Sequence, residues 1–367
     1  MCPQRIGDVL LATPLARSLK RAWPEAELDV LVFQGCEGAL ENNPDIAAVL
    51  ALPQRTSLRD KLSQLRRLWR RYDLAVSPLP TDRARLYCRI AARHAVGLLR
   101  PGRQERSKAL LLDQWALFDD RDTHTVAMGL SLATLLGIAP CAEVVLPRAA
   151  PAQRRLVDDY LAALATPSAG LVVLHPYPKF AYKMWPRAAW IALGRWLQAR
   201  GLNLVFTGAA LPEEMAYVHS IAAALGGAAL NLAGRLSLAQ SADLIGRARL
   251  YVGPDTAVTH IAAATGTPTI ALFGPSNPVK WGPWPSTWRS LASPWQRRGS
   301  ACHDTLCLLQ GEDIRGCVPC GLEGCDRHLA SRSACLDTLS VQRVTQAAER
   351  LLDQAISAPA ARGASRP

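Results

Sequence analysis

The sequence lacks any apolar run long enough to cross a membrane. A transmembrane helix needs about 20 consecutive apolar residues, and no such stretch occurs in the 367 residues. The start, Met1–Arg5, also lacks the apolar core of an export signal. We therefore expect a cytoplasmic protein.

The sequence also lacks internal repeats, a helix-turn-helix signature and an RNA-binding signature. The net charge of +12 favours an anionic partner, which includes nucleic acid, a membrane surface and a phosphorylated substrate. The basic residues are not interleaved with the aromatic residues of a single-strand binding surface. We therefore expect no nucleic acid partner.

The composition is that of a folded protein, with 49% hydrophobic and 20% charged residues. A chain of 367 residues exceeds the usual size of one hydrophobic core, so two domains are expected. The ten cysteines are spread thinly and no export signal accompanies them. Reduced thiols or a metal site are therefore expected in place of disulfides.

Short apolar runs alternate with helical patterns, which is typical of βα units and a parallel sheet. The expected strands are Leu28–Phe33, Leu74–Ser77, Leu171–His175, Leu202–Thr207, Leu250–Val252 and Thr269–Phe273. The expected helices are Pro14–Arg21, Leu58–Arg71, Thr125–Leu136, Ala152–Leu164, Arg187–Arg200, Glu213–Leu225, Ser237–Ala248 and Ser340–Leu352.

Prolines near 147–168 indicate a connection between two domains. We expect one domain over residues 1–150 and a second over residues 151–356, with a cysteine-rich loop at 302–335. The stretch 275–316 is expected to form long surface loops, and residues 357–367 a disordered tail.

The first segment with candidate chemistry is Arg5–Pro14, a glycine turn that leads into a helix. It places Asp8 near a βα junction, and ligands of open α/β sheets bind outside the carboxyl ends of the strands. Asp8 is therefore a candidate general base. The alternative, which the spacing alone favours, is an aspartate that caps a helix.

The second segment, His175–Pro186, runs from a strand through a loop into a helix. Lys179 and Lys183 lie in that loop, where an ammonium group stabilises a departing diphosphate. Lys183 directly precedes a helix entrance, which makes an anion site more credible there. For Lys179 a solvated loop lysine is a strong alternative.

The third segment, Tyr251–Ala264, is a strand followed by an alanine-rich helix. Asp255 and Thr256 are good capping residues, and the free amides of the helix start favour a phosphate. His260 lies one turn after Thr256 on the same face. A histidine on a helix is nevertheless more often a packed residue than a ligand contact.

Two further glycine turns follow strands, at Phe206–Glu214 and at Thr269–Pro278. The first contains Gly208 and Glu214, and a carboxylate at this place accepts hydrogen bonds from ribose hydroxyls in other nucleotide-binding folds. The equally weighted alternative is an acidic residue that complements the start of a helix.

Together these segments resemble glycosyltransferase family nine, the ADP-heptose:lipopolysaccharide heptosyltransferases, from Ile6 to about Leu352. The matching motifs, in order, are Gly7–Leu10, His175–Pro176, Lys183–Pro186, Asp255–Ala257, His260–Ala264 and Phe273–Pro275. The resemblance implies the α/β GT-B architecture, with two facing Rossmann-like lobes and parallel sheets. It places the acceptor on the N-terminal lobe and the sugar nucleotide on the C-terminal lobe.

The resemblance implies inverting, metal-independent transfer of heptose from ADP-heptose to the inner core of lipopolysaccharide, without a cofactor. By that resemblance Asp8 is the base and Lys183 the diphosphate contact. Donor contacts are expected from Gly208, Glu214 (or Glu213), Asp255, Thr256 and His260, and acceptor contacts from Arg55, Arg59 and Lys61. Only five residues precede Ile6, whereas the family's first strand needs several more apolar residues there, so we expect either a short first strand or a sequence start that lies too far downstream. Tyr177–Pro178 replaces smaller residues of many relatives, which affects the donor pocket.

Four cysteines in one loop-rich segment, Cys317, Cys320, Cys325 and Cys335, have spacing compatible with zinc or an iron–sulfur cluster. Reduced thiols are the leading alternative. The segment 58–71 carries leucines at helical spacing with arginines between them, which suits a membrane surface, an anionic acceptor or an ordinary solvated helix. The competing functions are another GT-B transferase or epimerase, and a zinc-bearing nucleic-acid-binding protein.

Overall fold

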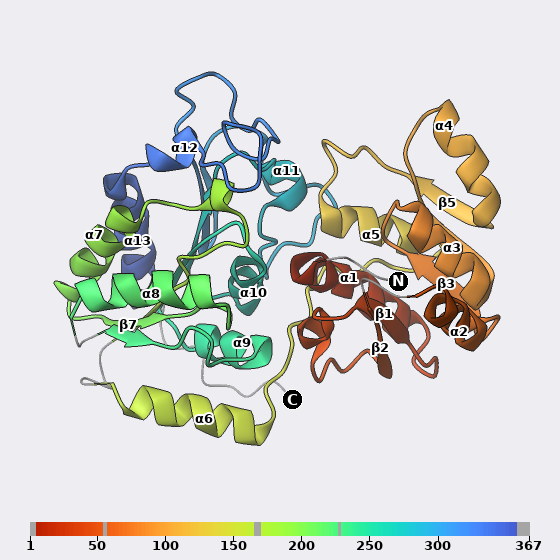
Figure 1. Ribbon diagram of the computed structural model, residues 1–367, viewed down its shortest axis with the longest axis horizontal. Helices are drawn as coiled ribbons and strands as arrows, with labels where there is room; N and C mark the ends of the chain where they lie inside the picture. Colours follow the sequence, from red (N-terminus) through yellow and green to blue (C-terminus); the bar gives the residue numbers. More distant parts are fainter. Residues whose placement is uncertain (1–4, 54–56, 165–169, 227–228, 358–367) are drawn as a thin grey trace. The chain divides into compact units, whose positions relative to one another are not determined.

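The computed structural model describes residues 5–53, 57–164, 170–226 and 229–357 (Figure 1). The chain forms two compact units, Met1–Arg148 with Val279–Pro294, and Ala149–Pro278 with Trp295–Pro367. This differs from a single boundary near residue 150, because Val279–Pro294 packs with the first unit. Residues 358–367 of the expected tail lie outside the described residues.

The first unit contains two small parallel sheets, of order β1-β2 and β3-β4-β5. Its elements are α1 (Ile6–Ala22), β1 (Asp29–Phe33), η1 (Glu37–Leu40), β2 (Ala48–Leu52), α2 (Leu58–Leu68), β3 (Tyr72–Ser77), α3 (Asp82–Ala91), β4 (Ala92–Leu99), α4 (Arg103–Arg106), η2 (Ser107–Leu111), β5 (Gln114–Leu117) and α5 (Thr125–Leu135). Leucines of α1 pack with α5 and β4 in one core.

The second unit is built on a seven-stranded sheet of order β11-β12-β10-β9-β6-β7-β8. Its elements are α6 (Pro151–Ala162), β6 (Leu171–Leu174), η3 (Ala181–Lys183), α7 (Arg187–Gln198), β7 (Asn203–Phe206), α8 (Pro212–Ala224), β8 (Ala229–Asn231), α9 (Leu238–Gly246), β9 (Leu250–Pro254), α10 (Ala257–Thr265), β10 (Thr269–Phe273), β11 (Ala301–His303), β12 (Leu306–Gln310), α12 (Ala334–Asp337) and α13 (Val341–Ser357); α11 (Pro278–Trp281) crosses into the first unit.

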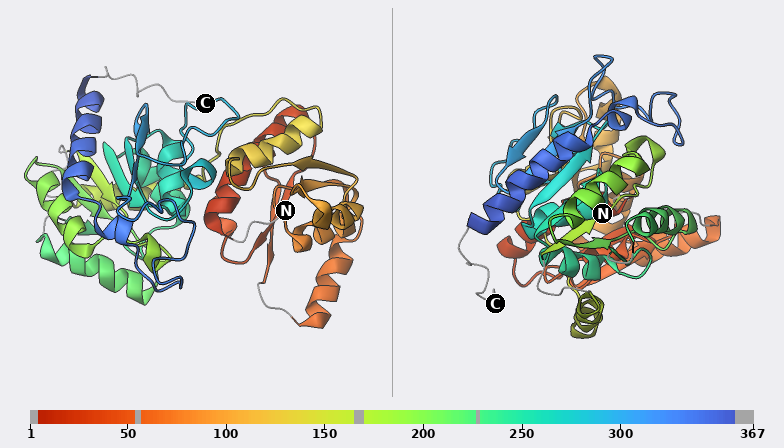
Figure 2. Two further views of the ribbon diagram at one scale, coloured as in Figure 1. Left: turned by 90° about the horizontal axis from the view of Figure 1, so that it is seen from above. Right: turned by 90° about the vertical axis from the view of Figure 1, so that its left-hand side faces the viewer.

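Helices cover both faces of this sheet, which explains why its central strands are apolar throughout. Side chains of α7, α8 and α13 share one core with the strands, whereas α9 and α10 pack together and α10 also contacts β9 and β10. Figure 2 shows α13 running along the sheet. The strands β6, β7, β9 and β10 are buried along their whole length.

Helix α1 begins earlier than predicted, at Ile6, and continues through Pro14. A proline inside a helix removes the donor for the carbonyl four residues earlier. The hydroxyl of Thr13 donates to the carbonyl of Leu10 over 2.7 Å, which supplies the missing partner. The helix therefore passes the proline without ending there.

The prediction of surface loops over 275–316 is wrong. Strand β12 lies in this stretch, is fully buried and pairs in parallel with β10. Trp284 is buried too, and its indole nitrogen donates to the carbonyl of Ala142 over 3.0 Å. Tertiary pairing decides this segment, because the apolar run Leu306–Leu309 is too short to stand out among prolines and tryptophans. Within the described parts of the chain, no helix is long and apolar enough to cross a membrane.

Candidate functional site

The second unit has a topological switch point between β6 and β9. From β6 the chain proceeds to β7 and β8 on one side, then returns to β9 and β10 on the other. In open α/β sheets, ligands bind at the carboxyl ends of the two strands where the order reverses. The loops after β6 and β9 are therefore the expected place for a ligand.

Lys183 and Asp255 meet at this switch point. Lys183 ends η3 in the loop after β6, and Asp255 directly follows β9. The Lys183 Nζ lies 2.5 Å from the Asp255 Oδ2, with side-chain exposures of 18% and 7%. Burial alone raises the pKa of Asp255, but the Lys183 ammonium and a hydrogen bond from Ser276 together lower it below its ordinary value. The site thus contains a partly buried ion pair.

The structure corrects the capping role expected of Asp255. The N-cap of α10 is Thr256, and its side chain makes no capping hydrogen bond. The Asp255 carboxylate is instead bonded to Lys183. The first amides of α10 therefore lack a side-chain cap, which leaves them suited to an anion.

His260 lies on α10 and is buried. Burial lowers the pKa of His260 to about 4, with Asp255 opposing and Lys183 adding to the shift. Its ring is therefore neutral at pH 7. Among the described residues, its Nδ1 is one of three buried side-chain polar atoms without a hydrogen-bond partner. A buried polar atom without a partner is costly, so a ligand group is a natural partner for it.

Gly208 and Glu214 lie together after β7. The Glu214 carboxylate accepts a hydrogen bond from the backbone N–H of Ala209 over 2.7 Å. A Cβ on Gly208 would lie 3.0 Å from a Glu214 carboxylate oxygen and 3.2 Å from the Cβ of Ala233. Burial raises the pKa of Glu214 to about 7. The close approach of Glu214 and Ala233 to Gly208 explains why a residue without a Cβ lies there. The hydrogen bond from Ala209 fixes Glu214 against the loop that follows β7.

Asp8 lies in the first unit, in the first turn of α1, whose N-cap is Arg5. The alternative in which Asp8 is itself the cap is therefore wrong. Its side chain is half-buried. An acidic residue in a first helical turn is stabilised by the free amides and the helix dipole.

Residues 63–311 match the model of glycosyltransferase family 9 (heptosyltransferase). The chain belongs to this family. A lipopolysaccharide heptosyltransferase 3 of Escherichia coli is 29% identical over 290 residues, which are 76% of this chain and 83% of the relative.

Solved structures show the same fold. A family 9 glycosyltransferase of Veillonella parvula aligns with a TM-score of 0.74 at 19% identity, over 96% of both chains. The E. coli ADP-heptose lipopolysaccharide heptosyltransferase II aligns with a TM-score of 0.69 at 22% identity, over 97% of this chain and 98% of the other. The resemblance to family 9 and the predicted α/β GT-B fold are thus confirmed, and the protein is a glycosyltransferase.

The expected acceptor residues of this family 9 chain are only partly described. Arg55 lies outside the described residues, and Arg59 and Lys61 belong to α2 without described side chains. The helix ends at Leu68, earlier than predicted, and Arg70 has a left-handed φ of 47°. Leu62 and Trp69 are 63% and 64% exposed, so the predicted apolar face is not fully buried against the core.

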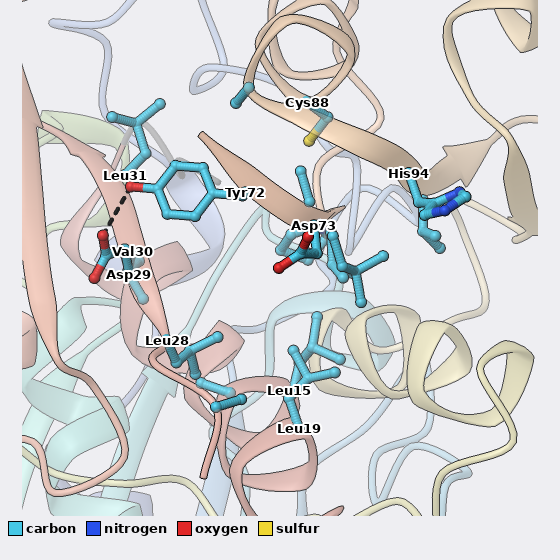
Figure 3. A pocket seen from close by; sticks show the side chains of 18 of the residues that line it. Leu15, Leu19, Leu28, Asp29, Val30, Leu31, Tyr72, Asp73, Cys88 and His94 are labelled. Atoms are coloured by element: carbon cyan, nitrogen blue, oxygen red, sulfur yellow. Dashed lines mark hydrogen bonds between the residues drawn. The ribbon is translucent and has the colours of Figure 1, made fainter. Parts of the chain in front are cut away.

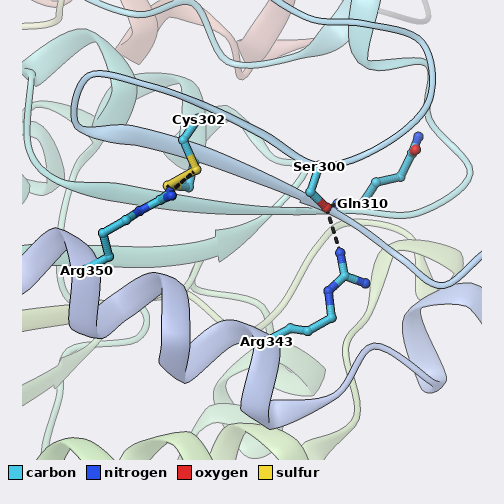
Figure 4. The surroundings of a disulfide bond; sticks show 6 residues. Ser300, Cys302, Gln310, Arg343 and Arg350 are labelled. Carbon is cyan, nitrogen blue, oxygen red and sulfur yellow. Dashed lines mark hydrogen bonds between the residues drawn. A yellow bond between two sulfur atoms is a disulfide. The ribbon is translucent and has the colours of Figure 1, made fainter.

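The sequence predicted no disulfide, and for two of the cysteines this prediction is wrong. Cys302 and Cys307 stand opposite each other on the antiparallel strands β11 and β12, and form a disulfide. The guanidinium of Arg350, from α13, contacts both sulfur atoms (Figure 4). The strand pairing brings the two sulfurs together, and sequence spacing alone did not reveal it.

The other cysteine cluster is not arranged as the zinc hypothesis requires. Cys317, Cys320, Cys325 and Cys335 line one small cavity of about 20 Å³. Burial raises the pKa of Cys335 to about 12. Across the described residues, no three histidine, cysteine or acidic side chains are placed to hold a metal ion.

His175 follows β6 and belongs to the His175–Pro176 motif, for which the sequence predicted no individual role. Its Nδ1 lies 3.0 Å from the Thr207 hydroxyl, and burial lowers the pKa of His175 to about 4. This neutral pair joins the loops after β6 and β7 beside the switch point. Two signals in the sequence could have indicated this pair: the His175–Pro176 motif, and the position of His175 and Thr207 directly after buried strands.

Proposed function

We propose that this protein transfers heptose from ADP-heptose to the inner core of lipopolysaccharide, with inversion at the anomeric carbon. Membership of family 9 supports the reaction class. The observation that carries the donor assignment is the Lys183–Asp255 pair at the switch point of the second unit. It places a cation and the free amides of α10 at the position where nucleotides bind in such sheets.

The donor diphosphate lies against Lys183 and the start of α10. The bond between the anomeric carbon and the diphosphate breaks in the reaction, and ADP gains negative charge as it leaves. Lys183 stabilises that charge and so takes the part that a divalent cation plays elsewhere. Transfer is therefore expected to need no metal ion.

Asp255 keeps the Lys183 ammonium in place before the donor arrives. Thr256 and neutral His260 lie at the same helix start. The Nδ1 of His260 lacks a hydrogen-bond partner and can donate to or accept from a donor group. Gly208 and Glu214 form the neighbouring loop, which suits contact with the nucleoside.

Asp8 is the proposed general base. Its carboxylate takes the proton of the acceptor hydroxyl while the hydroxyl oxygen forms a bond to the anomeric carbon. Arg55, Arg59 and Lys61 are proposed to bind the anionic acceptor. Exposed Trp69 and its arginine neighbours suit a peripheral position on the cytoplasmic face of the inner membrane.

The test is incubation of the purified protein with ADP-heptose and a series of core-truncated lipopolysaccharides, with ADP release followed by chromatography. ADP release that depends on both substrates and persists in EDTA supports the proposal. ADP release without an acceptor contradicts heptose transfer to lipopolysaccharide, and loss of activity in EDTA contradicts metal independence.

A further inference from the structure

The Cys302–Cys307 disulfide lies at the edge of the seven-stranded sheet, away from the proposed donor site. β11 is the outermost strand, and β12 and β10 separate it from β9 and β6, whose loops hold Asp255 and Lys183. Cys302 is half-buried, whereas Cys307 is fully buried. A reductant in solution therefore reaches the Cys302 sulfur more readily than the Cys307 sulfur.

The pairing of β11 with β12 holds the two cysteines opposite each other without help from the bond between their sulfurs. Cys302 and Cys307 are partners in the antiparallel register. Just before β11, the Ser300 hydroxyl oxygen accepts a hydrogen bond from the Gln310 N–H over 2.9 Å. Arg343 of α13 donates to the same oxygen over 2.7 Å (Figure 4). Because none of these bonds involves sulfur, we expect the hairpin to persist on reduction, with its two thiols still opposite each other.

Arg350 of α13 supplies a cation to both sulfurs. Its Nη2 lies 2.8 Å from the Cys307 Sγ and also contacts the Cys302 Sγ (Figure 4). Burial makes a thiolate costly. Cys88, which lines the cavity of the first unit in Figure 3, illustrates this, since burial raises its pKa to about 11. A guanidinium beside a thiol has the opposite effect, because it stabilises the thiolate.

We propose that Cys302 and Cys307 form a site of reversible thiol–disulfide exchange, in which Arg350 stabilises the Cys307 thiolate. The co-reactant is a dithiol for reduction, and the disulfide of that dithiol for oxidation. The inference goes beyond the proposed function and does not depend on it, because it concerns sulfur chemistry at the edge of the sheet.

Reduction takes place in two displacements. A thiolate of the dithiol attacks the Cys302 Sγ and forms a bond to it, while the Cys302–Cys307 bond breaks and its electron pair leaves on the Cys307 Sγ. The second thiolate of the dithiol then displaces Cys302, which leaves as a thiolate and takes a proton from water. The dithiol loses two electrons and the protein gains them. A thiol of lower pKa is a faster leaving group, so Arg350 accelerates the first displacement.

The test compares the parent with Arg350→Leu, which removes the guanidinium and keeps an aliphatic side chain. Each protein is equilibrated at pH 8 with mixtures of reduced and oxidised dithiothreitol and then alkylated, and the disulfide fraction is measured by mass spectrometry. We expect Arg350→Leu to need about a tenfold higher ratio of reduced to oxidised dithiothreitol for half reduction, because its Cys307 thiolate lacks a cation. The rate constant for reduction should fall by at least about threefold.

Two control variants separate the charge of Arg350 from a general change in α13. Arg350→Lys keeps the charge and should stay within about threefold of the parent. Arg200→Leu removes an arginine that pairs with Glu349 of the same helix over 3.0 Å, and should behave like the parent. Equal ratios for the parent and Arg350→Leu overturn the proposal. A parent that forms no Cys302–Cys307 disulfide in oxidised dithiothreitol overturns it as well.

The direction of attack has a test of its own. Cys307→Ser leaves the half-buried Cys302, and Cys302→Ser leaves the buried Cys307. We expect Cys307→Ser to form a mixed disulfide with oxidised glutathione about tenfold faster than Cys302→Ser, because exposure governs access to a thiol. Equal rates contradict attack at Cys302. None of these measurements requires heptose transfer, so a failure here is distinguishable from a failure of the proposed function.

Discussion

Replacement of Lys183 by methionine tests the donor site, because it removes the ammonium and keeps most of the side-chain volume. Asp255 then remains with 7% side-chain exposure and without its cation. Removing one partner of a buried ion pair typically costs about 3–5 kcal/mol. Lys183 retains 18% exposure, so we expect the lower end, about 3 kcal/mol of unfolding free energy.

The loss of stability depends on pH with a defined sign. In the parent the pKa of Asp255 is lowered, so its stabilising contribution is present above the unfolded-state pKa and is lost as pH falls through the folded-state pKa. Without Lys183, burial dominates and raises the pKa of Asp255. Protonation of Asp255 at low pH then stabilises the variant. The difference in unfolding free energy between parent and variant therefore narrows as pH falls.

The assays are urea unfolding at pH 8 and pH 5, ADP binding by calorimetry, and steady-state transfer. We expect turnover to fall about 10²–10³-fold, more than ADP binding weakens, because charge develops on the diphosphate only as it leaves. Lys179→Met is the matched control, since Lys179 is exposed in the same loop. Lys183→Met with Asp255→Asn should recover most of the stability and none of the turnover.

Two results would refute this reasoning. If Lys183→Met unfolds like the parent at both pH values, the pair with Asp255 does not stabilise the protein. If Lys183→Met binds ADP and transfers heptose like the parent, the nucleotide does not bind at this switch point.

Three further predictions follow from other residues. Asp8→Asn should lower turnover about 10²–10⁴-fold with ADP binding intact; unchanged turnover removes Asp8 from the mechanism. Burial raises the pKa of Glu214 to about 7, so the free energy of unfolding should decline as pH rises from the unfolded-state pKa of Glu214 to about pH 7. Glu214→Gln should remove this pH dependence in unfolding experiments, while its amide oxygen still accepts the hydrogen bond from the Ala209 N–H. Cys302→Ser opens the short disulfide loop to Cys307 and should cost roughly 2 kcal/mol by the loop-entropy relation, whereas a parent that melts identically with and without reductant contradicts a stabilising disulfide.

Much of the second unit could be predicted from local pattern. The apolar runs at Leu171–Leu174 and Thr269–Phe273 are strands because buried parallel strands are apolar throughout. The order of motifs also identified the family. In contrast, β12 was missed, because its place in the sheet depends on pairing with β10.

The sequence by itself determined the alternation of strands and helices, the family, and the candidate residues that follow the strands. These depend on local periodicity and on residue types with specific chemistry. Only the tertiary structure decided that Asp255 pairs with Lys183, 72 residues away, that Cys302 faces Cys307, and that β1 and β3 belong to separate sheets. Those results depend on which strands become neighbours, and strand order is set by packing between segments far apart in the chain.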